Sequence, residues 1–361
     1  MTASPANYRH LNRMRLLATL PVLVAAVITT GVNYLQALAL NEGVGNGGWR
    51  DSLVRSWVNT ANSPDLVATV VAGLVHLVPV LLLAIIVAGF WERIFSVARG
   101  RPFNRACIVI AVLFTLLSHP AIPLFHVVFG LSFAMVFGYA VFGGDGKTFL
   151  APALVGAVVV QVSFPGALND HPIWTGLNGH DGTNLLAAYH QQGQAALEWN
   201  GLGWWDLFMG AAQGMMGSTA IPAIMLGAAI LVAGHLASLR LLAGLAVGML
   251  AGSLICLAIA GGDPAAGILN FPWHWHLVTG GLAFAMVFIA TDPAASCGTN
   301  HGRWIQGILT GLLVVLVRVV NPAHPDGINS VLLLVSVLAP VIDHGVTWFN
   351  IRRRMRVRLR T

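Results

Sequence analysis

The sequence predicts an all-α, polytopic membrane protein with about ten transmembrane helices. Of its 361 residues, 57% are hydrophobic and only 9% are charged, whereas about 25% of the residues of an ordinary globular domain are charged. Each membrane crossing uses about 20 apolar residues, so the chain can supply about ten crossings with little left over. These observations exclude a water-soluble fold and leave no room for a separate soluble catalytic domain.

The predicted helices follow apolar runs that are separated by glycine, proline and charged residues. We expect them to form a single transmembrane domain over residues 1–361. The first run is too long for the core of a cleavable signal peptide and predicts a retained helix. The predicted ranges are 16–40, 66–90, 104–118, 123–142, 149–166, 219–238, 241–260, 274–290, 304–320 and 328–347.

Several of these helices are predicted to be short or broken. The third would be only about 22 Å long at 1.5 Å per residue, less than the roughly 30 Å of the hydrocarbon core. It ends at Ser118-His119-Pro120-Ala121-Ile122-Pro123. Irregular backbone at membrane depth requires protein or a water-filled cavity to satisfy its peptide groups. Such interruptions therefore favour a permeation route, as in transporters.

An internal repeat is also predicted. The sequence Gly-Leu-Ser-Phe-Ala-Met-Val-Phe at 130–137 returns at 281–288 with alanine in place of the serine. Duplication is the interpretation we favour. Chance similarity between membrane helices rich in glycine, alanine and phenylalanine is the alternative.

The distribution of basic residues predicts the orientation of the chain. Most of the 19 lysines and arginines fall on one side if the N-terminus is cytoplasmic, as the positive-inside rule requires. The predicted outer loop between the two halves, residues 167–218, contains four acidic residues and no lysine or arginine. Both termini are therefore predicted to be cytoplasmic. The arginines at 352–360 predict a membrane anchor and not a nucleic-acid site.

Two ionisable residues in predicted helices are candidates for an ion route, because charges within a membrane are costly and usually functional. They are Asp343, in the tenth helix, and Arg318, in the ninth. Arg318 also lies near a helix end, so extension of its guanidinium to the interface is the alternative. His274 and His276 lack the further ligands that a metal needs. We predict no metal site and no residue that is catalytic by itself.

Six sequence blocks carry a resemblance to a known family. They are Gly89-Phe90-Trp91-Glu92, the segment 142–154 that begins Phe142-Gly143-Gly144-Asp145-Gly146-Lys147, the segment 272–278 (Pro-Trp-His-Trp-His-Leu-Val), Ala290-Thr291-Asp292-Pro293, the segment 318–327 and Ala339-Pro340-Val341-Ile342-Asp343-His344. Together they resemble the B subunit of the sodium-translocating NADH:quinone reductase (Nqr) and the related D subunit of Rnf complexes. The similarity extends over nearly the whole chain.

The resemblance implies a ten-helix subunit of a redox-driven sodium pump in the bacterial cytoplasmic membrane. Such a subunit works with other subunits in the lipid bilayer and passes electrons by way of flavin towards quinone. By position, the resemblance implies a quinone region at Ala88, Gly89, Phe90, Trp91 and Glu92. It also implies a sodium-handling carboxylate at Asp343.

The flavin positions depart from the family pattern. The Ser-Gly-Ala-Thr motif that carries covalent FMN is absent, and Thr183 is the best-placed hydroxyl in its stead. The two asparagines of the riboflavin region are Thr148 and Ala151 here. The alternative to a redox subunit is therefore a flavin-free channel or transporter on the same scaffold.

Overall fold

The computed structural model describes residues 5–40, 48–57, 65–144, 146–165, 185–193, 196, 203–211, 214–293, 295–321 and 327–358. Within these ranges all regular elements are helices, which confirms the predicted all-α class. Five of the helices are long and apolar enough to cross a membrane. They are α1 (Pro5–Leu40), α3 (Leu66–Ala98), α12 (Leu239–Ala260), α15 (Asn300–Val320) and α16 (Ile328–Arg358).

The remaining predicted crossings are shorter or broken helices. Four shorter apolar helical segments are α4 (Ala106–Leu117), α5 (Leu124–Phe133) with its continuation η1 (Ala134–Ala140), α6 (Pro152–Ser163) and α11 (Ile221–Ala233). The eighth prediction, 274–290, corresponds to α13 (Trp275–Val278), α14 (Leu282–Phe284) and η5 (Ala285–Ile289). Helix α4 stops where Pro120 and Pro123 follow, because proline lacks an N–H donor and restricts the residue before it.

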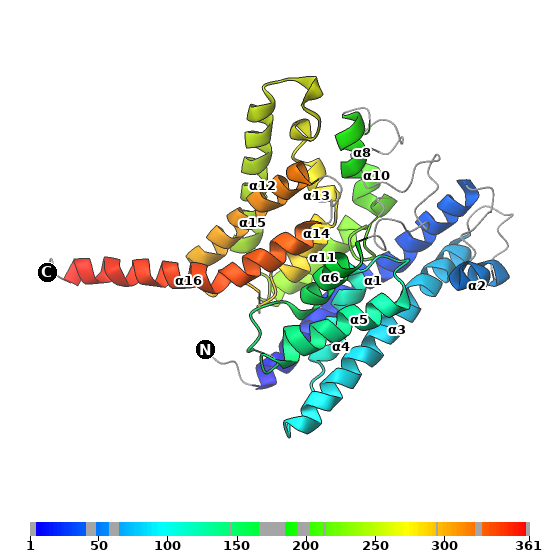
Figure 1. The fold of residues 1–361 in the computed structure, drawn as a ribbon, viewed down its shortest axis with the longest axis horizontal. Coiled ribbons are helices and arrows are strands. Elements are labelled where there is room, and N and C mark those ends of the chain that lie inside the picture. Colours follow the sequence, from blue (N-terminus) through cyan, green and yellow to red (C-terminus); the bar gives the residue numbers. More distant parts are fainter. Residues whose placement is uncertain are drawn as a thin grey trace.

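The helices lie side by side with their connections grouped at two opposite ends (Figure 1). The start of α1 and the end of α16 lie at one of these ends. The other end carries α2 (Trp49–Trp57), α8 (Leu185–Gln192) and the turn from α12 into η4 (Pro264–Asn270). A chain that crosses the membrane an even number of times, as predicted, begins and ends on the same side, which is consistent with this arrangement.

The repeated sequence adopts the same unusual backbone in both places. In the first copy the α-helix becomes a π-helix at Ala134, and in the second copy at Ala285, which is the corresponding alanine of each repeat. Short π-helical segments are rare and frequently occur at functional sites. The repeat therefore extends from sequence to backbone conformation.

The described part of the predicted outer loop packs on the second half of the chain. It contains α8, α10 (Trp204–Asp206) and η3 (Leu207–Ala211). The Tyr189 hydroxyl donates to the Asn270 carbonyl at 3.2 Å, and the Trp204 indole donates to the His274 carbonyl at 3.1 Å. These segments thus cover the broken helix that begins at Trp275.

Helices α12 and α15 cross at a contact made of glycines. Gly244, Gly248 and Gly252 follow one another at four-residue intervals on α12, and Gly307 and Gly311 do so on α15. A Cβ at Gly244 would lie 2.9 Å from the Trp304 carbonyl oxygen, and the other contacts are also close. Small residues allow membrane helices to approach to backbone contact. This crossing therefore fixes α15 against α12.

A methyl group at this crossing should destabilise the fold. In Gly248→Ala, the new Cβ would lie closer than 3.0 Å to the Ile308 carbonyl oxygen, and overpacking of this kind costs about 1–3 kcal/mol. The midpoint of thermal unfolding of the purified chain should fall. Gly345→Ala on α16, where a Cβ meets nothing within 4 Å, is the control. Equal midpoints for the two variants would contradict this account of the crossing.

Candidate functional site

The predicted quinone region lies near the end of α3 and is partly open. Ala88 is buried, but a Cβ at Gly89 would meet no atom of the described structure within 4 Å. The neighbouring Phe90 side chain is 57% exposed. In a membrane protein such a surface faces lipid or another subunit. A planar apolar molecule in the bilayer can therefore approach α3 at Gly89 and Phe90.

The next two residues are tied to the protein interior. The Trp91 indole donates to Ser132 Oγ at 2.9 Å, and Ser132 belongs to the first copy of the repeat. Glu92 is buried, and its Oε1 accepts from the Asn104 backbone N–H at 3.1 Å and from Ser96 Oγ at 3.3 Å. This anchoring holds the Gly89–Phe90 surface in a fixed position against α5.

A chain of contacts joins this region to the glycine-rich loop after η1. The Asn104 side chain donates to the Tyr139 hydroxyl at 3.1 Å, and the Gly144 N–H donates to the Tyr139 carbonyl at 3.1 Å. Arg101 donates to the Gly143 carbonyl at 2.9 Å. Both glycines have positive φ angles, 102° and 86°, which side chains strongly disfavour. The structure thus joins the predicted quinone region to the glycine-rich loop that precedes Thr148 and Ala151.

The riboflavin positions do not fit the group that the resemblance implies. Ala151 is 2% exposed and has no polar side-chain atom, so it cannot replace an amide. Thr148 is half-buried and offers a single hydroxyl. Because neither position offers an amide and one offers no polar group, these residues do not fit riboflavin. Thr183, the predicted FMN position, lies outside the described residues.

Asp343 binds a second glycine-containing loop at the start of α15. Its carboxylate accepts from the Gly298 N–H at 2.6 Å, from the Thr299 N–H at 3.1 Å and from the Thr299 hydroxyl at 2.5 Å. The N-terminal end of a helix favours negative charge. Asp343 therefore fixes this loop to α16, and a further role on an ion route stays a prediction.

Cys297, in the same loop, is not poised for redox or metal chemistry. Burial, followed by the nearby Asp343 carboxylate, raises the pKa of its thiol to about 12. The reactive form of cysteine is the thiolate, so the thiol is protonated at neutral pH. The residues that the structure describes also include no group of three or more His, Cys, Asp or Glu side chains arranged for a metal ion.

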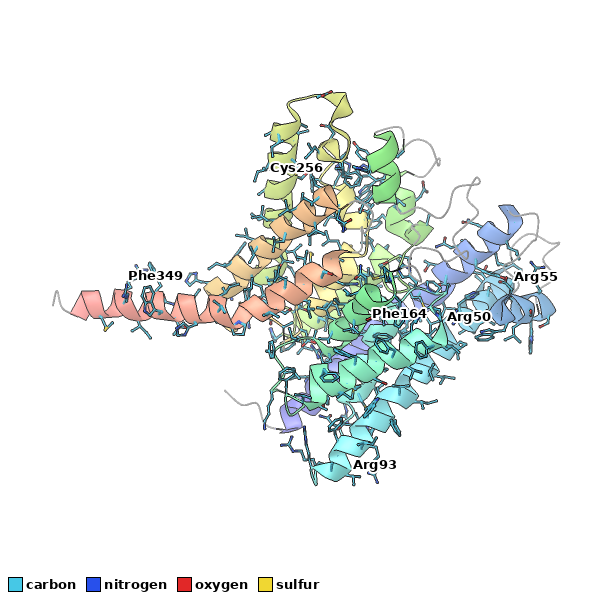
Figure 2. The ribbon with its side chains drawn as sticks, in the orientation of Figure 1. Arg50, Arg55, Arg93, Phe164, Cys256 and Phe349 are labelled. Atoms are coloured by element: carbon cyan, nitrogen blue, oxygen red, sulfur yellow. The ribbon has the colours of Figure 1, made fainter. Side chains whose placement is uncertain are left out.

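Two buried arginines occupy the two helix breaks. Arg50, on α2, donates to the carbonyls of Pro120 and Ile122 at 3.0 and 3.1 Å, between α4 and α5; Figure 2 labels this residue beside the end of α3 and α5. Arg50 was not among the residues predicted from the sequence. In the sequence, Arg50 is distinguished only by its place in a predicted outer segment, where Arg55 is the one other basic residue.

Arg318 makes the corresponding contacts in the second half. It donates to the carbonyls of His276 and Thr279 at 3.0 and 2.7 Å, and its Nη1 lies 2.9 Å from His276 Nδ1. Arg318 is only 1% exposed, so its guanidinium is held within the protein by the broken helix. The charge is held inside because the break between α13 and α14 leaves carbonyl groups that need donors.

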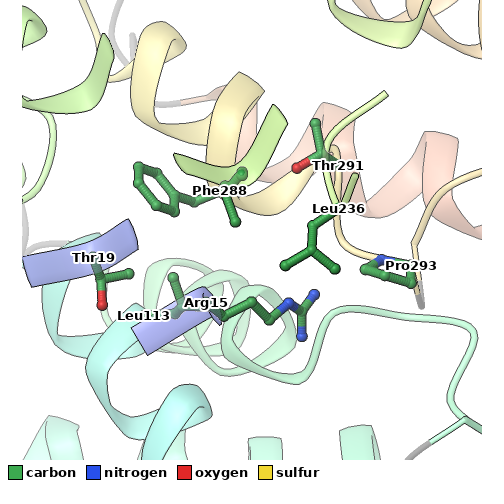
Figure 3. A pocket seen from close by; sticks show the side chains of 8 residues that line it. Arg15, Thr19, Leu113, Leu236, Phe288, Thr291 and Pro293 are labelled. Atoms are coloured by element: carbon green, nitrogen blue, oxygen red, sulfur yellow. The ribbon is translucent and has the colours of Figure 1, made fainter. Parts of the chain in front are cut away.

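A crevice separates α1 from the second half of the chain near the N-terminal end. Its lining comes from α1, α4, α11, η5 and the residues after η5, and includes Arg15, Phe288 and Thr291 (Figure 3). The space inside it that water-sized molecules can occupy is only about 10 Å³, far below the roughly 300–1,000 Å³ of small-molecule sites.

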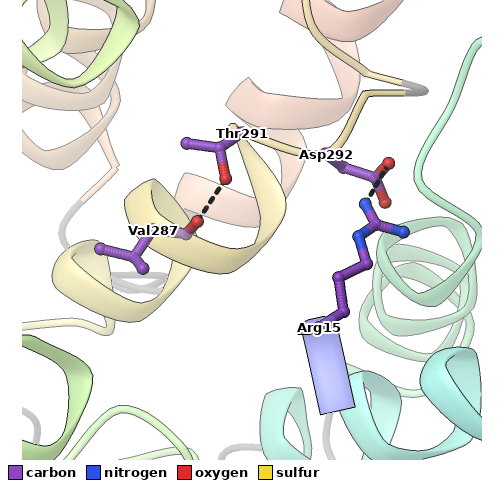
Figure 4. Close-up of polar contacts among 4 residues, drawn as sticks. All are labelled: Arg15, Val287, Thr291 and Asp292. Atoms are coloured by element: carbon purple, nitrogen blue, oxygen red, sulfur yellow. Dashed lines mark hydrogen bonds and ion pairs between the residues drawn. The ribbon is translucent and has the colours of Figure 1, made fainter. Parts of the chain in front are cut away.

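An ion pair closes one side of this crevice. Arg15 lies 2.5 Å from the buried carboxylate of Asp292, and the adjacent Thr291 donates to the Val287 carbonyl at 2.5 Å (Figure 4). Asp292 was part of a recognised block but was not proposed as a site residue. Asp292 is a buried carboxylate a few residues after the second copy of the repeat. A carboxylate in that position of the sequence indicates a functional residue.

Comparison with known proteins shows the family to which the chain belongs. The profile of the NQR2, RnfD, RnfE family matches residues 2–351. The chain belongs to this family. The B subunit of the Na(+)-translocating NADH-quinone reductase of Chromohalobacter salexigens is 37% identical over 342 residues, which cover 94% of this chain and 82% of the relative.

Two further relatives with the same name are similar throughout. The protein from Pseudomonas paraeruginosa is 41% identical over 308 residues, which cover 85% of this chain and 76% of the relative. The protein from Azotobacter vinelandii is 38% identical over 341 residues, which cover 94% of this chain and 84% of the relative. The family resemblance seen in the sequence blocks is thereby confirmed for the whole chain.

Proposed function

We propose that this member of the NQR2, RnfD, RnfE family is a membrane subunit of a redox-driven, Na⁺-translocating complex. In this proposal electrons pass by way of flavin towards quinone, and the other subunits supply the electrons. The relatives are named as the B subunit of the Na(+)-translocating NADH-quinone reductase, which supports a subunit of this type of complex. The chain would lie in the bacterial cytoplasmic membrane with both termini cytoplasmic.

The observation that carries the quinone assignment is the open surface at Gly89 and Phe90 beside the anchored Trp91 and Glu92. A quinone that diffuses in the bilayer can reach this surface without a channel through the protein. Phe90 offers an aromatic ring for stacking. Glu92 is a nearby carboxyl group that can hold a proton, which the reduction of quinone consumes together with electrons.

Coupling to sodium follows from electrostatics in a medium of low dielectric constant. An added electron attracts a nearby cation strongly where the dielectric constant is low. Asp343 and Arg318 mark the proposed ion route, and Asp292 adds a further buried carboxylate. Unwound backbone carbonyls commonly coordinate Na⁺ in transporters. Here arginine occupies the carbonyls of both breaks, so an ion could bind them only if a guanidinium moved away.

Covalent FMN on Thr183 is the part of the proposal with the simplest test. A bound FMN would supply one-electron transfer. A fluorescent flavin band should follow the denatured chain in a gel and disappear in Thr183→Ala, while Thr175→Ala in the same loop should keep it. A chain without flavin in the assembled complex would favour the flavin-free channel or transporter, which the alanine at position 151 also supports.

Filling the open surface should weaken quinone use without affecting the fold. In Gly89→Leu the new side chain enters space that is free of described atoms within 4 Å of the Cβ, so stability should be unchanged. In the assembled complex, the KM for quinone should rise by about tenfold or more, which corresponds to about 1.4 kcal/mol.

The control is Val97→Leu, on an exposed part of the same helix. It should leave the KM for quinone unchanged, and both variants should reduce an artificial acceptor that bypasses quinone at the normal rate. A Gly89→Leu complex with an unaltered KM would refute the quinone region proposed for α3.

A further inference from the structure

Helix α16 is longer than a membrane crossing requires. Its 31 residues extend about 46 Å at 1.5 Å per residue, whereas the hydrocarbon core is about 30 Å thick. If the crossing begins at Ile328, it is complete near residue 347. The remaining part of the helix therefore reaches the headgroup region and beyond.

This terminal part of α16 leaves the protein body. Every residue from 347 to 353 is exposed, so all faces of the helix lack protein contacts in the described structure. Figure 1 shows the helix projecting alone towards the C-terminus, and Figure 2 places Phe349 on this projection. Its surroundings in the membrane therefore come from outside the part of the chain that the structure describes.

The exposed side chains combine apolar surface with positive charge. Trp348, Phe349 and Ile351 are exposed, and so are Arg352 and Arg353. The Arg352 guanidinium lies over the Trp348 ring, 3.7 Å from its centroid. Tryptophan is typical of the membrane interface, and the stacked arginine keeps free N–H groups for an anion at the same depth.

The sequence around these residues is strongly basic. Arginine also occurs at positions 354, 356, 358 and 360, and no aspartate or glutamate follows Asp343. Clusters of four to eight basic residues next to a transmembrane helix bind anionic lipids. Because no aspartate or glutamate follows Asp343, no side-chain carboxylate nearby in the sequence neutralises this cluster.

We propose that the exposed terminal part of α16, residues 348–353, is a binding site for anionic phospholipid headgroups. Arg352 and Arg353 bind the phosphate, and Trp348 and Phe349 insert among the acyl chains beside it. This site is independent of the quinone and sodium assignments, because none of its residues belongs to them. It would fix the depth and tilt of α16, and with them the loop that Asp343 holds.

Native mass spectrometry of the full-length chain tests this site. The detergent-solubilised protein is titrated with dioleoylphosphatidylglycerol and, separately, with dioleoylphosphatidylcholine. The anionic lipid should bind more tightly. Because each basic residue near the surface contributes roughly fivefold, Arg352→Gln with Arg353→Gln should weaken its binding by about twenty-five-fold. Binding of the zwitterionic lipid should change little.

Two control variants make the result specific. Arg93→Gln with Arg105→Gln removes the same charge from exposed positions elsewhere and should reduce binding less than threefold. Arg352→Lys with Arg353→Lys retains the charge and should retain most of the affinity. Circular dichroism should show equal helix content in all variants, so that misfolding is separated from loss of the site.

Three results would overturn the proposal. The first is an unchanged preference for the anionic lipid in the Arg352→Gln, Arg353→Gln variant. The second is an equal loss in the Arg93→Gln, Arg105→Gln control. The third is loss of the other subunits from the purified complex of the glutamine variant, which would show that the helix end docks on protein.

Discussion

The structure depends on the need to satisfy backbone carbonyls where membrane helices break. In a hydrocarbon environment an unpartnered peptide group costs several kcal/mol, so irregular backbone persists only where the protein supplies partners. Arg50 supplies them between α4 and α5, and Arg318 supplies them between α13 and α14. Each guanidinium provides several N–H donors in a fixed plane, which suits two carbonyls at once.

The breaks in turn determine where the functional surfaces lie. After each break the chain enters a copy of the repeat and turns from α-helix to π-helix at the corresponding alanine. Ser132 in the first copy anchors Trp91 beside the proposed quinone region. Directly after the second copy, Asp292 pairs with Arg15 of α1. The duplicated element thus supports a membrane-facing surface in one half and an ion pair between the halves in the other.

Much of this architecture could be predicted from the sequence, because apolar length and proline positions act locally. The predicted ranges for α4, α12 and the broken helix near 274–290 differ from the observed ones by a few residues. The hydrogen bonds of Arg318 could not be predicted from the sequence. Its acceptors lie on a separate helix, and their carbonyls are available only because that helix breaks. Arg50 was missed for the same reason.

The contacts made by the quinone region, the riboflavin region and Asp343 could be predicted only in part from the sequence. The link between Glu92 and the glycine-rich loop after η1 depends on Asn104 and Tyr139, two residues without a recognisable motif. The role of Asp343 as the partner of the 298–299 backbone also depends on how α16 packs on the start of α15. Sequence similarity indicated Asp343 and the two regions, but only the tertiary structure shows what each one contacts.

Hydrogen–deuterium exchange of the full-length chain in lipid nanodiscs measures directly whether the arginines hold the breaks. Arg50→Gln should accelerate exchange in the peptide that spans 116–126 and leave 274–284 protected, and Arg318→Gln should do the reverse. If both peptides keep their protection in both variants, the carbonyls at the breaks are stabilised by other groups and the account is contradicted.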